Sequence, residues 1–378
     1  MLLSEEERLL QSTVREFADQ VLMPRAAEYD ENCQFPWENI RDLASLGLFG
    51  LTIDEDFNGN GGTIRQLAIV VEEIARGCGS TSVIYVAHLG LCAHFISRFG
   101  NKQQKSKWMP PLAKAEKIGA FALTEPLSGS DAAALRTNIS TDGDNYVING
   151  TKLFTTNAEE ADLFIILGTH DRSQGSRAVD ALIVERGIEG FKINPQHGKM
   201  GMRATSTAEL IFEDCRVPKT NLVGLEGEGF RQTMNVLNSS RIAIASQCVG
   251  LAQAAYNSCY EYARQRELFS NKLVEFQGMQ WILAEMATNI LAARGLVMHA
   301  ATLYDNDMPF IAEASMAKLF ASRVAVEAAD KAVQIHGGTG YFAPTIAERL
   351  YRDAKLTEIY EGTSEIQRTI IARNLLEL

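Results

Sequence analysis

The spacing of apolar residues changes twice along the chain. Over residues 1–118 it is helical, and in 5–21 apolar side chains recur every three or four positions. Over residues 119–227 short runs rich in β-branched and aromatic residues, such as ADLFIILG and TAELIFEDCRV, are separated by turn residues. Over residues 228–378 the helical spacing returns. These three stretches predict a helical domain, a small all-β domain (a barrel or a sandwich) and a second helical domain.

The C-terminal stretch is typical of long helices. No proline occurs between Pro218 and Pro309, and several amphipathic segments are joined by short loops. This pattern predicts an antiparallel four-helix bundle. The resulting fold class is α+β and multidomain, and the order helices, strands, helices excludes a βαβ dinucleotide-binding fold.

Composition narrows the class of protein. The chain has 378 residues, which suggests two or three domains, and 46% of them are apolar. Lys plus Arg is 36 and Asp plus Glu is 47, so the formal charge is 36 − 47 = −11. An acidic chain is a poor general binder of nucleic acid, because such binding needs a basic surface. We therefore expect a globular protein without a nucleic-acid partner.

The compartment is predicted from what the sequence lacks. The N-terminal segment is acidic and helical, unlike a secretory signal or a transit peptide, and no apolar run reaches about 18 residues. The six cysteines show no regular spacing, and the histidines form no metal-ligand motif. We expect no membrane span, no metal and a cytoplasmic location. The mitochondrial matrix fits only if a transit peptide has been removed.

Three motifs have ordinary structural interpretations. Residues 54–59 open like a calcium-binding EF-hand loop, but position twelve is Arg65, a cation. HGGTG (336–340) lacks the spacing of a phosphate-binding loop and is expected to be a turn between helices. His88 and His94 flank apolar residues and are expected to be buried and hydrogen-bonded.

Three further segments are more polar and glycine-rich than their surroundings demand. They are FALTEPLSGSD (121–131), KLFTTN (152–157) and YRDAKLTEIYEGTSEIQR (351–368). Hydroxyl groups and backbone N–H groups in such loops suit phosphates and ring heteroatoms. Any one of them alone is equally consistent with a capped structural loop.

Together these segments resemble the acyl-CoA dehydrogenase family of flavoproteins, over essentially the whole chain. Other matching segments are KMGMRATSTAELIFEDCRVP, NLVGLEGEGF, RQRELF and QIHGGTGY. The short-chain, butyryl-CoA branch is the most similar, through IYEGTSEIQR and SSRIAIASQCVGLAQ. The resemblance implies the family's fold, with helical, β and four-helix-bundle domains in that order. It also implies FAD as the cofactor and α,β-desaturation of an acyl-CoA.

By resemblance, Glu361 in IYEGT is the base that removes the α-proton while the β-hydrogen leaves as hydride to the flavin. Exclusion of water raises the pKa of such a carboxyl group toward that of the acidified substrate. The backbone N–H of Glu361 is expected to help hold the thioester oxygen. Some relatives carry the base at the position matched by Ser240, and a serine cannot serve as that base.

The resemblance also assigns cofactor contacts. Those near the β domain are Phe121, Leu123, Thr124, Ser130, Phe154, Thr155 and Thr156. Those expected to reach FAD from a neighbouring subunit are Arg266, Phe269 and Gln277, and those completing the adenine and phosphate end are Gln334, Ile335, His336, Gly337, Gly338, Thr363, Ser364 and Glu365. Two positions depart from the family pattern. Ser270 stands where glycine usually follows the phenylalanine, and Phe154 stands where many relatives have tryptophan.

The substrate contacts implied are Ser130, Asn238, Arg241, Tyr360 and Gly362, with Asn238 at a position that is often Asp in this branch. The segment 77–97, which is expected to contribute to the acyl pocket, contains no Lys or Arg. Since burial of an unpaired carboxylate is costly, we expect an uncharged acyl group that is short, branched or cyclic.

Bulky side chains in that segment are expected to shorten the pocket, namely Tyr85, His88 and Phe95. The resemblance further implies an electron-transfer flavoprotein as electron acceptor and a homotetramer, a dimer of dimers that shares FAD across subunits. Three alternatives stay open: an acyl-CoA oxidase or a relative with another reaction on an acyl-CoA-like substrate, a binding protein without turnover, and a helical scaffold. The presence of Glu361 argues against the second, and the scaffold leaves the three polar loops unexplained.

Overall fold

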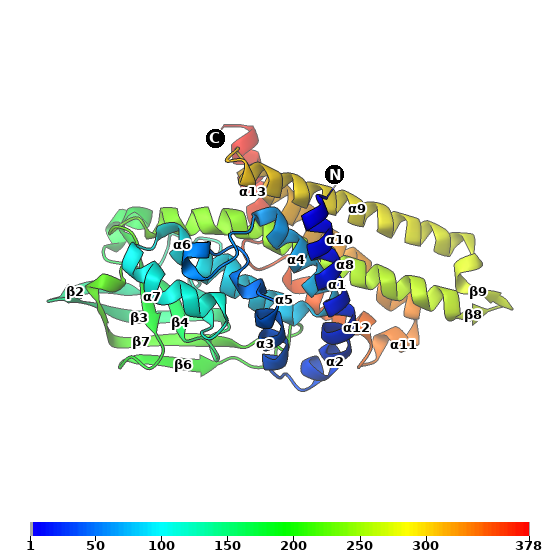
Figure 1. Ribbon diagram of the computed structural model, residues 1–378, viewed down its shortest axis with the longest axis horizontal. Helices are drawn as coiled ribbons and strands as arrows, with labels where there is room; N and C mark the ends of the chain where they lie inside the picture. Colours follow the sequence, from blue (N-terminus) through cyan, green and yellow to red (C-terminus); the bar gives the residue numbers. More distant parts are fainter. Residues whose placement is uncertain (1–2, 378) are drawn as a thin grey trace.

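The computed structural model describes residues 3–377, and its N-terminal part consists of helices (Figure 1). Ser4 and Glu7 form a capping box that starts the first helix, which continues through a π-helical turn, η1, into α2. The helices of this part are α1 (Glu5–Phe17), η1 (Ala18–Leu22), α2 (Met23–Glu31), α3 (Trp37–Ser45), α4 (Ile64–Gly77), α5 (Gly79–Tyr85), η4 (Val86–Ala93), α6 (His94–Phe99) and α7 (Lys102–Ala113).

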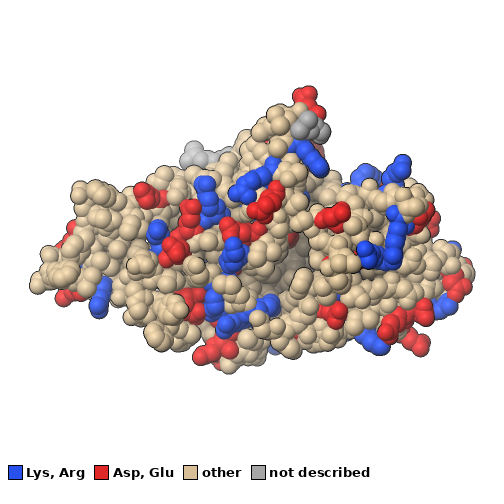
Figure 2. Space-filling model, turned by 180° about the vertical axis from the view of Figure 1, so that it is seen from behind, with Lys and Arg blue, Asp and Glu red and all other residues tan. Residues whose placement is uncertain are grey.

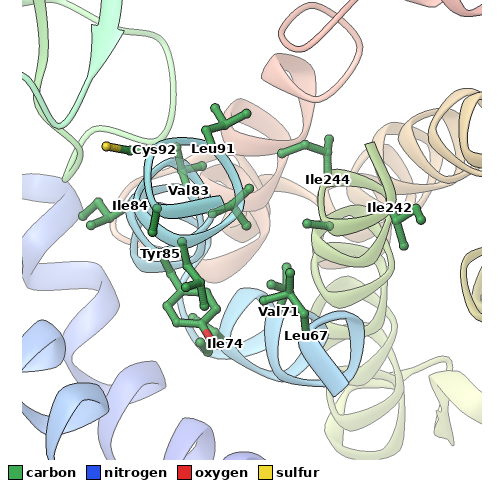
Figure 3. Close-up of a cluster of buried hydrophobic side chains, with 14 of the residues drawn as sticks. Leu67, Val71, Ile74, Val83, Ile84, Tyr85, Leu91, Cys92, Ile242 and Ile244 are labelled. Atoms are coloured by element: carbon green, nitrogen blue, oxygen red, sulfur yellow. The ribbon is translucent and has the colours of Figure 1, made fainter. Parts of the chain in front are cut away.

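The segment from α5 through η4 is the buried axis of the N-terminal part. Every residue of these two elements is buried, and they pack beside α4 and α8 (Figure 3). The helical stretch Gly79–Phe99 is one of two that are long and apolar enough to cross a membrane by length and composition alone. It is 94% buried inside the protein, as expected of a core helix.

The middle part is a curled seven-stranded sheet with the order β1-β4-β2-β3-β7-β6, and β5 pairs with β4. This confirms the predicted all-β middle part. β1 lies parallel to β4, whereas β3 and β7 form a long antiparallel pair with two register shifts. The strands are β1 (Gly119–Ala122), β2 (Asn138–Asp142), β3 (Asn145–Thr156), β4 (Leu163–Thr169), β5 (Val179–Glu185), β6 (Phe191–Pro195) and β7 (Thr207–Pro218).

The C-terminal part returns to helices, as predicted, and α10 packs against α8, α9 and α13. A small hairpin, β8–β9, joins the long helices α8 and α9 at the end of the molecule opposite the sheet (Figure 1). The elements are α8 (Gly229–Gln265), β8 (Glu267–Leu268), β9 (Asn271–Lys272), α9 (Gln277–Asp305), α10 (Ile311–His336), α11 (Gly338–Tyr341), α12 (Ile346–Leu356) and α13 (Ser364–Leu375).

The second stretch with membrane-like composition is Gln277–Asp305, which forms α9 and is only 33% buried. Two of its large apolar side chains, Trp281 and Leu291, are 62% and 67% exposed, and Leu291 borders a groove that residues of α1 and α4 also line. Much of α9, including the apolar side chain of Trp281, is therefore uncovered within one chain.

Candidate active site

Glu361 lies in a tight turn between α12 and α13. Its φ is +51°, and that of Gly362 is +95°, so two successive residues adopt the left-handed conformation. The φ of Gly362 explains the glycine, since residues with a Cβ rarely adopt that conformation, and a Cβ there would also displace the Gln367 side-chain nitrogen, 2.6 Å away. Thr363 then caps α13, since its hydroxyl accepts a hydrogen bond from the Ile366 N–H.

Polar groups from two long helices surround the Glu361 carboxylate. The Ser240 hydroxyl on α8 donates a hydrogen bond to Glu361 Oε2. Burial raises the pKa of Glu361, while the Ser240 hydroxyl and the positive charges of Arg241 and Lys318 oppose that rise. Within residues 3–377 the Glu361 backbone N–H has no hydrogen-bond acceptor. A carboxylate and a free N–H donor are thus presented from one residue.

Three other predicted substrate contacts lie on α8 or against it, namely Asn238, Arg241 and Tyr360. Arg241 is 4% exposed and donates to the Asn238 side-chain oxygen, and burial lowers the pKa of Arg241 to about 10. Tyr360 donates its hydroxyl hydrogen to Gln247, whose amide nitrogen lies 2.7 Å from Ser82 Oγ on α5. A chain of polar contacts therefore links the Glu361 turn to the N-terminal helices.

Two residues of this neighbourhood escape the sequence analysis, Gln247 and Lys318. Lys318 on α10 is fully buried, and its Nζ donates to the Gly362 carbonyl over 2.8 Å. A polar residue at an inward position of an otherwise apolar helix is the signal that could have found both of them.

The loop after β1 is fixed by a buried ion pair. Lys152 Nζ lies 2.7 Å from Glu125 Oε1 and donates to the Leu123 carbonyl over 3.1 Å. Glu125 also accepts the backbone N–H groups of Arg136 and Thr137. Both side chains of the pair are at most 3% exposed. This arrangement holds the loop that contains the predicted contacts Leu123, Thr124 and Ser130, next to Phe121 in β1.

Near the end of β3, a bulge exposes an aromatic ring. The register with β7 shifts between Lys152 and Thr155, and Phe154 has a φ of +56° and is 64% exposed. The hydroxyl of the neighbouring Thr155 is buried without a hydrogen-bond partner. An exposed ring beside an unpaired hydroxyl fits a ligand that combines a flat ring with polar edges.

The remaining predicted cofactor contacts do not reach this region in one chain. Arg266 and Phe269 belong to the β8–β9 hairpin, and Gln277 is the first residue of α9. The segment 334–338 ends α10, where the His336 ring packs on Tyr262 at 4.4 Å, near the same end of α8. These residues form a second group, at the far end of the bundle from the sheet (Figure 1).

Ser270, which stands where the family usually has glycine, lies at the tip of the β8–β9 hairpin. Phe269 and Ser270 have φ values of +51° and +65°, so both occupy left-handed positions of a two-residue turn. Ser270 therefore adopts the conformation that a glycine would take without strain. Phe269 is 89% exposed at this tip.

Two of the side chains expected to shorten the acyl pocket point elsewhere, so that expectation is wrong for Tyr85 and His88. The Tyr85 hydroxyl donates to the Leu48 carbonyl, and its ring points toward Ile74 on α4, away from Ile244 on α8 (Figure 3). His88 is buried between Leu112 and Gly119, which confirms that it is a hydrogen-bonded core histidine. Helical spacing alone does not say which face meets which neighbour.

His94 is half-buried and its Nε2 lies 3.3 Å from Ser239 Oγ, so its predicted hydrogen bond is present but its burial is partial. Residues 54–59 form a surface turn in which the Asp54 side chain caps a short helix. In segment 336–340 the turn between helices is Gly337 alone, since α10 ends at His336 and α11 begins at Gly338. Among residues 3–377, no group of three or more His, Cys, Asp and Glu side chains could hold a metal ion.

On the face opposite that of Figure 1, charges of both signs are interspersed (Figure 2).

Comparison with known proteins accounts for this arrangement. Three family models match in chain order: the N-terminal domain of acyl-CoA dehydrogenase over residues 4–116, its middle domain over 120–215 and its C-terminal domain over 227–376. Together they cover the helical, β and helical parts of the structure.

Individual relatives match over their full length. The short-chain specific acyl-CoA dehydrogenase of Clostridium acetobutylicum is 45% identical over 370 residues, which are 98% of each chain. The butyryl-CoA dehydrogenase of Megasphaera elsdenii superimposes with a TM-score of 0.97 at 37% identity, covering 100% of this chain and 99% of that one. A chain solved in work on the electron transferring flavoprotein of Acidaminococcus fermentans has a TM-score of 0.98 at 40% identity, with 100% of both chains covered. This chain belongs to the acyl-CoA dehydrogenase family.

Proposed function

We propose that this protein is a FAD-dependent acyl-CoA dehydrogenase that desaturates a short, branched or cyclic, uncharged acyl-CoA between its α and β carbons. The observation that carries the proposal is the Glu361 turn, which presents a carboxylate and an unpaired N–H between α8 and α13. The family membership and the similarity to short-chain relatives support the same reaction.

The residues of the turn divide the chemistry between them. The Glu361 carboxylate takes the α-proton, and the electron pair of that C–H bond becomes the second bond between the α and β carbons as the β-hydrogen leaves with its own pair. The Glu361 N–H donates to the thioester oxygen, where negative charge develops as the proton leaves. Ser240 and Arg241 favour the ionised carboxylate that this step requires.

The residues near the sheet fit FAD, which supplies the acceptor for the hydride when it is bound. Phe154 offers an exposed aromatic face, and Thr155 offers a buried hydroxyl without a partner. Thr363, Ser364 and Glu365 stand at the N-terminus of α13, where the positive end of the helix dipole suits a phosphate. The loop held by the Glu125–Lys152 pair would position Leu123, Thr124 and Ser130 around the cofactor, beside Phe121 in β1.

The absence of Lys and Arg from segment 77–97 supports an uncharged acyl group, because a distal carboxylate would be buried there without a cation. The face of this segment toward α8 carries Ser82, Val86 and Gly90, which are small or apolar. Arg241 and Asn238 on α8 are the proposed partners of the CoA portion.

We further propose a homotetramer in which the residues of the β8–β9 hairpin and of segment 334–338 complete the FAD site of a neighbouring copy. The exposed ring of Phe269 and the exposed Trp281 side chain of α9 support this assembly. An electron-transfer flavoprotein is the proposed acceptor. A reducing compartment such as the cytoplasm is supported by the six cysteines, all of which are free and five of which are buried.

Anaerobic titration with a panel of acyl-CoAs tests the reaction. Butyryl-, isobutyryl-, cyclohexanecarbonyl-, octanoyl- and glutaryl-CoA would each be added while the flavin absorbance is followed. We expect bleaching by one or more uncharged members, and we expect Glu361→Gln to slow it about 1,000-fold, as for loss of a general base. Rapid recovery of the absorbance in air would favour an oxidase. A flavin that no acyl-CoA bleaches, or strong bleaching by glutaryl-CoA, would contradict the proposal or its substrate class.

A further inference from the structure

Lys318 is an ionisable side chain that the proposed chemistry does not use. It lies on α10 with no solvent exposure, and burial lowers the pKa of its ammonium group to about 8. An unpaired buried charge costs several kcal/mol. A lysine at such a position therefore needs partners that compensate for the loss of water.

Its main partner is the backbone of the catalytic turn. Lys318 Nζ donates to the Gly362 carbonyl over 2.8 Å, and the Gln367 side chain on α13 donates to the same oxygen over 2.9 Å. Gln367 also donates to the Glu361 carbonyl over 3.3 Å. Two donors from two helices thus hold a turn whose left-handed φ values at 361 and 362 are costly for the first residue.

The charges around Lys318 come from every element that packs on it. Arg241 and Cys248 face it from α8, Glu358 and Glu361 from the segment between α12 and α13, and Glu365 from α13. Burial raises the pKa of the Cys248 thiol to about 11, so this thiol is neutral. The ammonium group therefore adds positive charge beside the Glu361 carboxylate.

We propose that Lys318 is a positioning residue for Glu361: its ammonium group holds the Gly362 carbonyl, and so fixes the direction of the Glu361 carboxylate and N–H, and places a positive charge next to the base. This role rests on the proposed function of Glu361. In this role Lys318 neither transfers a proton nor contacts the substrate.

Three variants separate the charge from the hydrogen bond. Lys318→Met removes both, Gln367→Met removes only a neutral donor, and Lys318→Arg keeps the charge. Lys331→Met is the matched control, because Lys331 lies on the same helix but is exposed and paired only with its neighbour Asp330. Thermal unfolding and FAD content would be recorded for each variant.

Two readouts distinguish positioning from a purely structural role. The first is the pH titration of the Glu361 carboxyl group by infrared difference spectroscopy, assigned as the band lost in Glu361→Gln. The second is the pH dependence of kcat/KM for the best acyl-CoA. In Lys318→Met we expect the carboxyl group to titrate at higher pH, because a neighbouring positive charge lowers a carboxyl pKa, and the acid limb of kcat/KM to move with it. We also expect kcat to fall about 100-fold from misplacement of the base.

Gln367→Met should lower kcat without moving the titration, Lys318→Arg should keep the wild-type titration, and Lys331→Met should match the wild type in both. Wild-type titration and kcat in a folded Lys318→Met would overturn the proposal. If Lys318→Met does not fold, two other results decide the proposal. Wild-type kcat in Gln367→Met would show that the hydrogen bonds to the Gly362 carbonyl do not position Glu361. A shifted titration of the Glu361 carboxyl group in Lys318→Arg would show that the positive charge at position 318 does not set the pKa of Glu361. Should no acyl-CoA bleach the wild-type flavin, the proposed function fails, yet the infrared titration still decides what Lys318 does to Glu361.

Discussion

Two buried lysines lie beside the loops that carry the proposed chemistry. Lys152 and Lys318 are among the largest fully buried side chains, and each donates to a backbone carbonyl of such a loop, Leu123 in one case and Gly362 in the other. Since a buried ammonium group has few alternative acceptors for its hydrogen bonds, each lysine favours one arrangement of its loop. Sequence motifs identify the loops, whereas these supports are visible only in three dimensions.

The Glu125–Lys152 pair gives the first prediction at this scale. Glu125→Gln leaves the Lys152 charge buried without its anion, so the free energy of unfolding should fall by about 3–5 kcal/mol. The control is Glu213→Gln, since Glu213 pairs with Lys192 in the same sheet but both side chains are about two-thirds exposed. That variant should change stability by less than about 0.5 kcal/mol. Urea denaturation measures both, and equal effects would show that burial of the pair does not matter.

Gly90 gives a second prediction, on substrate length. Residues four apart share a helical face, and on this face Ser82 contacts Gln247 and His94 lies 3.3 Å from Ser239, so Gly90 faces α8 between them. A Cβ at this buried position would meet only Val86 within 4 Å. Gly90→Leu should therefore reduce kcat/KM for octanoyl-CoA about tenfold more than for butyryl-CoA. A uniform loss across a chain-length series would instead indicate a general disturbance of the helix.

At the scale of elements, His88 joins the core helix to two other elements. Its Nε2 lies 3.0 Å from the Leu112 carbonyl on α7, and its Nδ1 accepts the Gly119 N–H of β1. This pattern requires a neutral ring, because a protonated Nδ1 cannot accept a hydrogen bond. Burial accordingly lowers the pKa of His88 to about 4, from 6.5.

The pH dependence of stability follows from that shift. The pKa of His88 is lower in the folded state than in the unfolded state. Neutral His88 therefore contributes its full share to the free energy of unfolding above about pH 6.5, and this share, about 3 kcal/mol, is lost as the pH falls toward 4. His94 also lowers the free energy of unfolding as the pH falls, whereas Asp353, whose pKa is raised to about 6 by burial, increases it. The effect of His88 is therefore measured by comparing a His88 variant with the wild type. His88→Gln should show a shallower loss of unfolding free energy between pH 6.5 and 4 than the wild type. His299→Gln, an exposed histidine on α9, should keep the wild-type slope.

The elements also show what sequence reasoning can reach. Hydrophobic spacing predicts the helices at both ends and the strands between them, because each buries one periodic face. It does not predict the π-helical turns η1 and η4 or the bulge at Phe154, since these depend on how neighbouring elements pack. For the same reason Tyr85 is predicted to line a pocket that it does not face. At the site, the motif identifies Glu361, whereas Lys318 is missed because single lysines on helices usually face solvent.

At the scale of the whole molecule, one chain is elongated, with the curled sheet at one end and the β8–β9 hairpin at the other (Figure 1). The hairpin exposes Phe269 almost completely, and Trp281 and Leu291 on α9 are 62% and 67% exposed. Exposed apolar groups of this size usually mark a protein interface. A second copy that covers them would also bring the hairpin to a site that its own chain cannot reach.

The last prediction concerns this assembly. If the hairpin completes the FAD site of a neighbouring copy, Phe269→Ser should lower both the flavin content and the mass of the assembly, because cofactor binding and association then stabilise each other. Sedimentation velocity gives the mass, and the ratio of flavin to protein absorbance gives the content. Leu9→Ser is the matched control, since Leu9 is 68% exposed on α1, and it should change neither quantity. Added FAD should restore association in Phe269→Ser in proportion to the flavin that it takes up. A wild-type protein that is monomeric and yet saturated with FAD would refute the shared site, since a single chain would then hold the cofactor without the hairpin of another.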